Sequence, residues 1–230
     1  MQTAPHPIVK ICCISSIDEA RLAVAAGASA LGLVSAMPSG PGVITEQQIA
    51  EIAASVPAPV ATFLLTARQL ATDIAEQHRH CGTNTIQLVD HVSHDELRKL
   101  RALLPGVRLV QVIHVVNASS IVEAKELAPL VDALLLDSGN QALPVKQLGG
   151  TGRTHDWSLS RRICQNSPVP VFLAGGLNDS NIVRAVSSVT PYGVDLCSGV
   201  RTEGHLDALK LRAFFSALRS GVTNSVPDPG

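Results

Sequence analysis

One feature constrains this chain more than any other: short apolar runs rich in β-branched residues alternate with helical patterns along most of its length. The runs are predicted to be strands at residues 8–14, 30–34, 59–64, 85–88, 108–115, 133–136, 169–173 and 193–196. The segments between and after them are predicted to be helices at residues 16–26, 45–55, 67–81, 93–104, 120–128, 157–165, 181–189 and 207–218. Strands that are apolar throughout are typical of sheets covered on both faces.

Alternating βα units require parallel strands joined by right-handed crossovers. Eight such units in 230 residues predict an α/β fold with a single (β/α)8 TIM barrel, which usually takes about 250 residues. A doubly wound open sheet is the alternative, because alternation alone does not prove that the sheet closes. No linker or shift in composition divides the chain, so we expect one barrel domain at 1–219 and a flexible tail at 220–230.

Charge and composition exclude several classes of protein. The 18 basic and 19 acidic residues give a net charge of −1, so there is no positive excess for binding nucleic acid or an anionic membrane. No apolar run reaches the roughly 18 residues of a membrane span, and residues 1–7 do not resemble a signal peptide. The five cysteines lack paired CxxC spacing, which argues against structural zinc or a disulfide framework and indicates a reducing cytoplasm.

In a barrel of this kind, functional side chains lie where each strand ends and its loop begins. Lys10 and Cys12 end the first predicted strand, Gln87 the fourth, Asp137 the sixth and Asp195 the eighth. We therefore expect Lys10, Gln87 and Asp195 to contact the substrate. The histidines of the chain lack the spacing of metal ligands, so no metal site is expected.

Cys12 and Asp137 are the candidates for chemistry. The period of two along a strand puts Lys10 and Cys12 on one face and Cys13 on the other, so Cys13 is expected to turn away from the mouth. Cys12 and Asp137 could each have a structural role instead. A cysteine is often a small buried apolar residue, and an aspartate after a strand often caps a loop or helix. A cysteine is reactive only as a thiolate, and Lys10 is a positive neighbour on the same strand face.

Glycines gather in three consecutive predicted loops. Gly150 and Gly152 follow the sixth strand, Gly175 and Gly176 the seventh, and Ser198 with Gly199 the eighth. Glycine lets backbone N–H groups approach an anion closely, and the usual phosphate site of such barrels lies in the last two of these loops. We therefore predict a phosphate site there, although each glycine alone could be an ordinary turn residue.

Taken in order, these motifs resemble the phosphoribosylanthranilate isomerase family, (β/α)8 enzymes of tryptophan biosynthesis. The family's Lys-Ile-Cys-Gly strand is matched at residues 10–12, with Cys13 in place of the glycine. Leu-Leu-Leu-Asp is matched at 134–137, Gly-Gly-Thr-Gly at 149–152, Asp-Trp at 156–157 and Leu-Ala-Gly-Gly-Leu at 173–177. The resemblance covers the chain from Lys10 to about Phe215.

The resemblance implies an Amadori rearrangement of an N-(5-phosphoribosyl) amine to an aminoketose phosphate, with Cys12 as general base and Asp137 as general acid. It implies a small phosphorylated sugar as substrate and no metal or redox cofactor. We expect either a monomer or a homodimer, between which the sequence does not decide. Proton transfers of this kind typically contribute about 10²–10⁴-fold each.

The chain departs from the family at the end of the pocket that holds the aromatic amine. The family's Ser-Pro-Arg loop, whose Arg holds the anthranilate carboxylate, is here Ser39-Gly40-Pro41. Its Gln-Leu-His-Gly after the fourth strand is Gln-Leu-Val-Asp at 87–90, and its Glu after the last strand is Arg201. Three hypotheses remain: a phosphoribosylanthranilate isomerase with another carboxylate clamp, a paralogous isomerase of a different phosphorylated aminosugar, and a non-catalytic phosphosugar-binding barrel.

Overall fold

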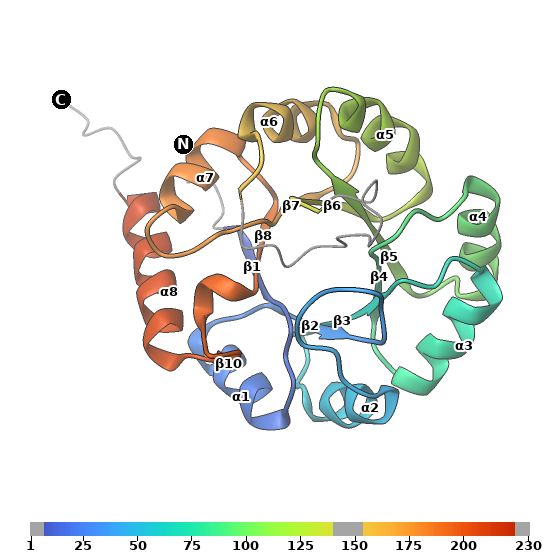
Figure 1. Ribbon diagram of the computed structural model, residues 1–230, viewed down its shortest axis with the longest axis horizontal. Coiled ribbons are helices and arrows are strands. Elements are labelled where there is room, and N and C mark those ends of the chain that lie inside the picture. Colours follow the sequence, from blue (N-terminus) through green and yellow to red (C-terminus); the bar gives the residue numbers. More distant parts are fainter. Residues whose placement is uncertain (1–6, 140–153, 224–230) are drawn as a thin grey trace.

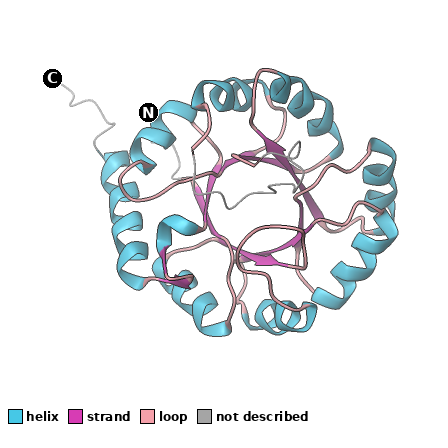
Figure 2. Ribbon diagram, viewed as in Figure 1, coloured by secondary structure: helices cyan, strands magenta, loops and turns pink. Residues whose placement is uncertain are grey.

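The computed structural model describes residues 7–139 and 154–223. In this part of the chain, eight parallel strands pair in the order β1 to β8 and close into a barrel, with the helices around it (Figures 1 and 2). β1 pairs directly with β8, so that Lys10 lies beside Asp195. The predicted barrel is confirmed, and the doubly wound alternative is wrong because an open sheet has no pairing between its first and last strands.

The elements alternate as the sequence pattern predicts. The barrel strands are β1 (Ile8–Ile11), β2 (Ala30–Val34), β3 (Ala61–Thr66), β4 (Thr85–Leu88), β5 (Arg108–His114), β6 (Ala133–Asp137), β7 (Val171–Leu173) and β8 (Gly193–Leu196). The helices are α1 (Ile17–Ala26), α2 (Glu46–Ser55), α3 (Ala71–Cys81), α4 (His94–Leu103), α5 (Ser119–Leu127), α6 (Trp157–Asn166), α7 (Ile182–Val189) and α8 (Ala208–Thr223). Short 3-10 turns η1 (Ala128–Leu130) and η2 (Ser198–Val200) and a small hairpin, β9 (Arg201–Thr202) and β10 (His205–Leu206), complete the described chain.

Side-chain caps fix where several helices begin. Thr45 and Gln48 form a capping box at α2, in which each side chain accepts a hydrogen bond from the other's backbone N–H. Ser16, Ser93 and Asp156 accept from backbone N–H groups in the first turns of α1, α4 and α6. Each cap satisfies a donor that the helix cannot, and is worth about 1 kcal/mol.

Apolar side chains fill two layers. The larger cluster lies between strands and helices and includes Leu31, Leu64 and Phe214. The smaller cluster fills the inside of the barrel and includes Phe63 and Phe172, whose rings pack edge to face with centroids 6.1 Å apart. Because the inside is a packed core, the chemistry is confined to the ends of the strands.

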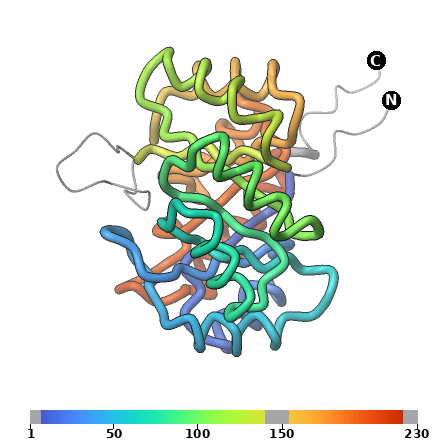
Figure 3. Tube along the Cα trace, turned by 90° about the vertical axis from the view of Figure 1, so that its right-hand side faces the viewer, coloured from blue at the N-terminus to red at the C-terminus, as the bar shows by residue number. Residues whose placement is uncertain are grey.

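Some boundaries differ from the sequence-based prediction. β1 stops at Ile11 rather than at residue 14, because the backbone turns left-handed at Cys13, where φ is 62°. α8 continues past Arg219 to Thr223, so the segment expected to be a flexible tail begins as helix. Viewed from the side (Figure 3), the loop between β2 and α2 and the β9–β10 hairpin project from the same end of the barrel.

Candidate active site

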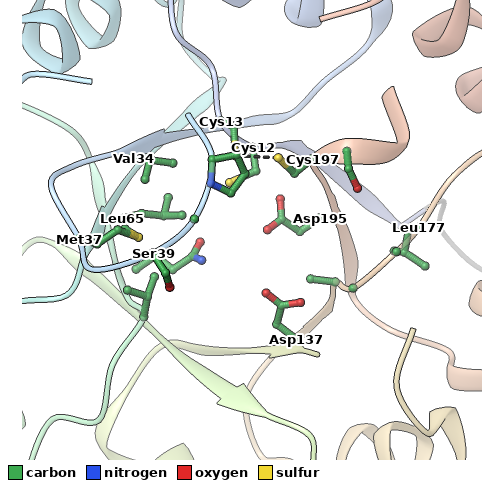
Figure 4. Close-up of a pocket in the computed structure, with 18 residues that line it drawn as sticks. Cys12, Cys13, Val34, Met37, Ser39, Leu65, Asp137, Leu177, Asp195 and Cys197 are labelled. Atoms are coloured by element: carbon green, nitrogen blue, oxygen red, sulfur yellow. Dashed lines mark hydrogen bonds between the residues drawn. The ribbon is translucent and has the colours of Figure 1, made fainter. Parts of the chain in front are cut away.

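A pocket opens at the carboxyl ends of the barrel strands (Figure 4). It is lined by residues that follow β1, by residues of β2, β3, β4, β6 and β8, and by the loops after β2, β4, β7 and β8. Of the residues predicted for the site, it is lined by Cys12, Gln87, Asp137, Gly175, Gly176, Asp195 and Ser198. Parallel strands bring their ends to one face, which explains why side chains distant in sequence meet here.

Cys12 and Asp137 lie on opposite sides of this pocket (Figure 4). Cys12 is 7% exposed, and its backbone N–H donates to Leu196 O at 2.7 Å, which extends the β1–β8 pairing by one residue. Asp137 is half-buried, and its Oδ1 accepts from the backbone N–H of Ser138 at 2.7 Å. A thiol and a carboxyl group therefore face a shared space from two different strands.

Cys13 does not turn away from the mouth, so that prediction is wrong. Its left-handed backbone breaks the alternation that holds only within a strand. Its side chain instead lines the pocket beside Cys12, and its Sγ lies 2.7 Å from Cys197 Sγ. The left-handed conformation favours glycine, the residue that the resembled family has at this position.

Lys10 lies beneath the pocket rather than in its lining. It is fully buried, and its Nζ forms an ion pair with Asp195 Oδ2 at 2.9 Å. Burial opposes the charge on Lys10, but the Asp195 carboxylate holds the pKa of the ammonium above its usual value. A Cβ atom on Gly32 would lie 2.8 Å from Cys12 Sγ and 3.0 Å from Lys10 Nζ. The ammonium is thus a close neighbour of the thiol and is not part of the described pocket lining.

Two buried acceptors in the pocket lack a partner within the part of the chain that the structure describes. They are Gln87 Oε1 and Asp195 Oδ1, and both residues line the pocket. A buried acceptor left without a hydrogen bond costs about 1–3 kcal/mol. A ligand with hydroxyl groups between β4 and β8 would satisfy both.

The loops after β7 and β8 pack against each other at one side of the pocket. A Cβ on Gly199 would lie 2.0 Å from Leu177 O, so only glycine allows this close approach of the two backbones. Gly175 and Gly176 have φ of 86° and 62°, which side chains rarely adopt. The predicted partners Gly150 and Gly152 lie outside the described residues.

Two of the residues that depart from the resembled family also line the pocket. Pro41 in the β2–α2 loop and Val89 after β4 both face the pocket. Asp90 is not among the described residues that line it, and its Oδ1 accepts from the backbone N–H of His91 at 2.8 Å. The Asp90 carboxylate, which would repel an aromatic carboxylate if it faced the pocket, therefore lies outside the described lining.

Arg201 and Glu19 support the loop that carries the two cysteines, a role that sequence analysis missed. Arg201 Nη2 donates to Cys12 O at 3.2 Å and to Cys13 O at 2.5 Å. Its Nη1 donates to Glu19 Oε1 at 2.9 Å. The Glu19 carboxylate also accepts from the backbone N–H groups of Ser15 and Leu206. The family has Glu at the position of Arg201, and a buried arginine needs a carboxylate partner. This need could have indicated from the sequence that an acidic residue such as Glu19 pairs with Arg201.

The structure adds two observations about other site types. Among the described residues, no group of three or more His, Cys, Asp or Glu side chains is placed to hold a metal ion. No described helix is long and apolar enough to cross a membrane.

Comparison with known proteins gives consistent matches. The chain matches the family model described as N-(5′-phosphoribosyl)anthranilate (PRA) isomerase over residues 9–217. The N-(5′-phosphoribosyl)anthranilate isomerase of Haloferax volcanii is 36% identical over 214 residues, which cover 92% of this chain and 93% of the relative. The enzyme of that name from Nostoc punctiforme is 36% identical over 213 residues, which cover 92% and 98%.

Solved structures show the same fold. The phosphoribosyl anthranilate isomerase of Thermotoga maritima has a TM-score of 0.80 and 25% identity, covering 93% of this chain and 99% of that one. A phosphoribosyl anthranilate isomerase in complex with reduced 1-(o-carboxyphenylamino)-1-deoxyribulose 5-phosphate has a TM-score of 0.77, 24% identity and the same coverage.

Proposed function

The chain belongs to the N-(5′-phosphoribosyl)anthranilate isomerase family, and from this premise we propose that its pocket rearranges an N-(5-phosphoribosyl) amine to an aminoketose phosphate. This is an aldose–ketose isomerisation of the kind used in tryptophan biosynthesis. The observation that carries the proposal is that Cys12 and Asp137 face each other across one pocket. The same pocket holds two unpartnered acceptors that suit sugar hydroxyls.

Two proton transfers accomplish the reaction. The Asp137 carboxyl protonates the furanose ring oxygen, the bond from this oxygen to C1′ breaks, and the nitrogen lone pair forms a Schiff base. The Cys12 thiolate then removes the proton from C2′, and the electron pair of that bond gives an enolamine. Tautomerisation of the enolamine yields the ketone at C2′. This sequence requires an acid within reach of the ring oxygen and a base within reach of the C2′ proton.

The ion pair beneath the pocket supports the base. A thiol is a competent base only when ionised, and a neighbouring positive charge stabilises the thiolate. Lys10 supplies that charge close to Cys12, and Asp195 keeps the ammonium in place. The free oxygen of Asp195 and that of Gln87 accept hydrogen bonds from the ribose hydroxyls in this proposal.

The phosphate end of the substrate is assigned to the loops after β7 and β8. Gly175, Gly176 and Ser198 line that side of the pocket, and Gly199 allows the two loops to approach. Phosphate groups are commonly held by backbone N–H groups of such glycine-rich loops. Gly150 and Gly152, outside the described residues, complete the proposed set.

A second candidate substrate class is favoured by one observation. Pro41 and Val89, two of the residues that depart from the family, line the pocket, and in this proposal they face the amine. Pro41 cannot form the bidentate contact by which an arginine holds a carboxylate. A paralogous isomerase of another phosphorylated aminosugar therefore remains the alternative, and the retained Cys12 and Asp137 argue against a barrel that only binds.

The test is a turnover assay with phosphoribosylanthranilate on the wild-type protein, Cys12→Ala and Asp137→Asn. Cys164→Ser is the matched control because Cys164 lies in α6 and not in the pocket. We expect each site variant to lose at least about 10²-fold in kcat, the typical contribution of one proton transfer. Wild-type rates in Cys12→Ala would overturn the assignment of the base.

Cellular location and assembly belong to the same proposal. The five cysteines are free thiols in the structure, a state that a reducing cytoplasm maintains. A cytoplasmic monomer or homodimer is proposed, and light scattering at the concentration used for the assay distinguishes the two assemblies.

A further inference from the structure

Three thiols meet where β1 and β8 end, and the proposed mechanism uses only one of them. Cys12, Cys13 and Cys197 all line the pocket. Cys13 Sγ and Cys197 Sγ are 2.7 Å apart, the contact drawn as a dashed line in Figure 4. Cys13 and Cys197 are separated by 184 positions in the sequence, so their meeting is a product of barrel closure.

Backbone pairing holds the two residues together. Ile11 lies opposite Leu196 in the parallel β1–β8 register, and Cys12 N–H donates to Leu196 O. Cys12 and Cys197 therefore follow directly from the last paired positions, and Cys13 is one residue further along the chain. Neighbouring strands are about 4.8 Å apart, within the separation that a disulfide spans.

The Cys13 side chain is also confined from its other side. The backbone at Cys13 is left-handed, and the Cys13 side chain lines the pocket. A Cβ on Gly42 would lie only 2.6 Å from Cys13 Cβ, so the β2–α2 loop packs directly on it. Cys13 is 5% exposed, so its side chain is enclosed between this loop and the end of β8.

The surroundings of the pair favour ionisation of Cys197 before Cys13. The hydrogen bond with Cys13 lowers the pKa of Cys197 against the effect of burial, and the Arg201 charge lowers it further. Hydrogen bonds with Cys12 and Cys197, together with burial, raise the pKa of Cys13. Cys197 is therefore the member that ionises first, and it is half-buried rather than fully enclosed.

We propose that Cys13 and Cys197 form a peroxide-reactive pair that closes reversibly to a disulfide at the rim of the pocket. The Cys197 thiolate attacks one oxygen of hydrogen peroxide, the S–O bond forms as the O–O bond breaks, and the released hydroxide is protonated to water. The Cys13 sulfur then attacks the Cys197 sulfur; the S–S bond forms, the S–O bond breaks, and hydroxide leaves with the Cys13 proton as a second water. Two thiols are oxidised and one peroxide is reduced.

The remaining cysteines provide an internal contrast. Burial raises the pKa of both Cys81 and Cys164 to about 12, so neither is a ready thiolate. Cys81 lies in α3 and Cys164 in α6, and neither lines the pocket. Reaction with peroxide is expected at the β1–β8 pair before these two.

The experiment exposes the reduced full-length protein to a small molar excess of hydrogen peroxide, alkylates the remaining thiols and measures mass. We expect the intact mass before alkylation to fall by about 2 Da, because two thiol hydrogens are lost. Alkylation should count three thiols instead of five, and digestion should yield a peptide linking Cys13 to Cys197. Dithiothreitol should restore all five. Cys164→Ser, the matched control, should still form the link.

Cys197→Ser and Cys13→Ser should each lose the linked peptide. Circular dichroism of the reduced variants verifies that they fold, and the linked peptide in the wild-type protein is decisive if either does not. A link between Cys12 and Cys13, or sulfinic acid at Cys197 with no disulfide, would overturn the proposal. Since no readout depends on turnover, its failure is separable from failure of the isomerase assignment.

Discussion

Lys10 shows how one side chain connects folding to chemistry. It is fully buried in a barrel interior that is otherwise mainly apolar, and Asp195 at 2.9 Å is its partner in an ion pair. The Lys10 ammonium also lies over the aromatic ring of Phe63, with Nζ 5.2 Å from the ring centroid. A buried ion pair of this kind adds little net stability, but removing one partner leaves the other charge uncompensated.

We therefore expect Lys10→Met to lower the free energy of unfolding by about 3–5 kcal/mol. The double variant Lys10→Met/Asp195→Asn should recover part of this loss, because it removes the unpaired carboxylate. Urea denaturation of the wild type and both variants measures the difference. Equal stability of the single and double variants would contradict the role given to the pair.

Gly199 is the second residue whose substitution has a defined consequence. An alanine there would place its Cβ 2.0 Å from Leu177 O, so the loops after β7 and β8 must separate. We expect Gly199→Ala to destabilise the protein by about 1–3 kcal/mol and to raise KM for the phosphosugar more than it lowers kcat. Gly106→Ala is the control, since a Cβ at Gly106 has no neighbour within 4 Å. An unchanged KM in Gly199→Ala would remove the loop pair from the phosphate site.

At the scale of elements, one ion pair joins α1, the β9–β10 hairpin and the end of β1. Arg201 binds Glu19 and both cysteine carbonyls, so it holds the segment that carries the proposed base. We expect Arg201→Gln to lower kcat more than it raises KM, because the Cys12 backbone loses a support while the phosphate loops keep theirs. Steady-state kinetics at saturating substrate checks this, and a pure KM effect would contradict it.

The same pair predicts a dependence of stability on pH. Burial raises the pKa of Glu19, but hydrogen bonds from Arg201, Leu206 and Ser15 outweigh it and hold the pKa below the usual 4.5. A carboxylate whose pKa is lower in the folded state stabilises the fold above its unfolded pKa, and this contribution disappears as pH falls through the folded value. The wild type should therefore lose Tm on acidification below about pH 4.5, and Arg201→Gln should lose less. Parallel Tm curves for the two proteins would contradict this assignment.

The elements also show how far sequence patterns reach. Capping residues such as Thr45 and Ser93, apolar periodicity and strand-end motifs predicted the barrel, because these signals act over a few neighbouring positions. The side-chain direction of Cys13 and the burial of Lys10 beneath the pocket were not predicted, for a different reason. Cys13 depends on a local left-handed turn, and the position of Lys10 depends on a partner 185 residues away. Neither is encoded in the pattern of a single strand.

At the scale of the whole molecule, the barrel separates the two ends of the pocket. The loops after β7 and β8 lie across the barrel from those after β2 and β4 (Figure 1). Of the residues proposed for phosphate, Gly175, Gly176 and Ser198 line the pocket, and so do Pro41 and Val89. One closed sheet can thus retain the proposed phosphate site and the acid–base pair while the residues that contact the amine differ from those of the family.

This separation predicts that substrate preference can be altered from one side alone. Pro41 is flanked by Gly40 and Gly42, with φ of 120° and 75°, in a loop that reaches the pocket. An arginine there can place its guanidinium toward an anthranilate carboxylate, a charged contact worth about 1.5–3 kcal/mol or roughly ten- to a hundredfold in kcat/KM. We expect Pro41→Arg to raise kcat/KM for phosphoribosylanthranilate mostly through KM.

Val89→His is the natural second change, because Val89 lines the same end of the pocket as Pro41. The two substitutions should couple, so the gain of the double variant should differ from the product of the single gains. Kinetics of the wild type, both single variants and the double variant on one substrate preparation measure this coupling. A wild-type kcat/KM already near the diffusional limit of about 10⁸–10⁹ M⁻¹s⁻¹ would show that another group holds the carboxylate. Tight binding without turnover in all four proteins would instead favour the barrel that only binds, because the acid–base pair would then be present but idle.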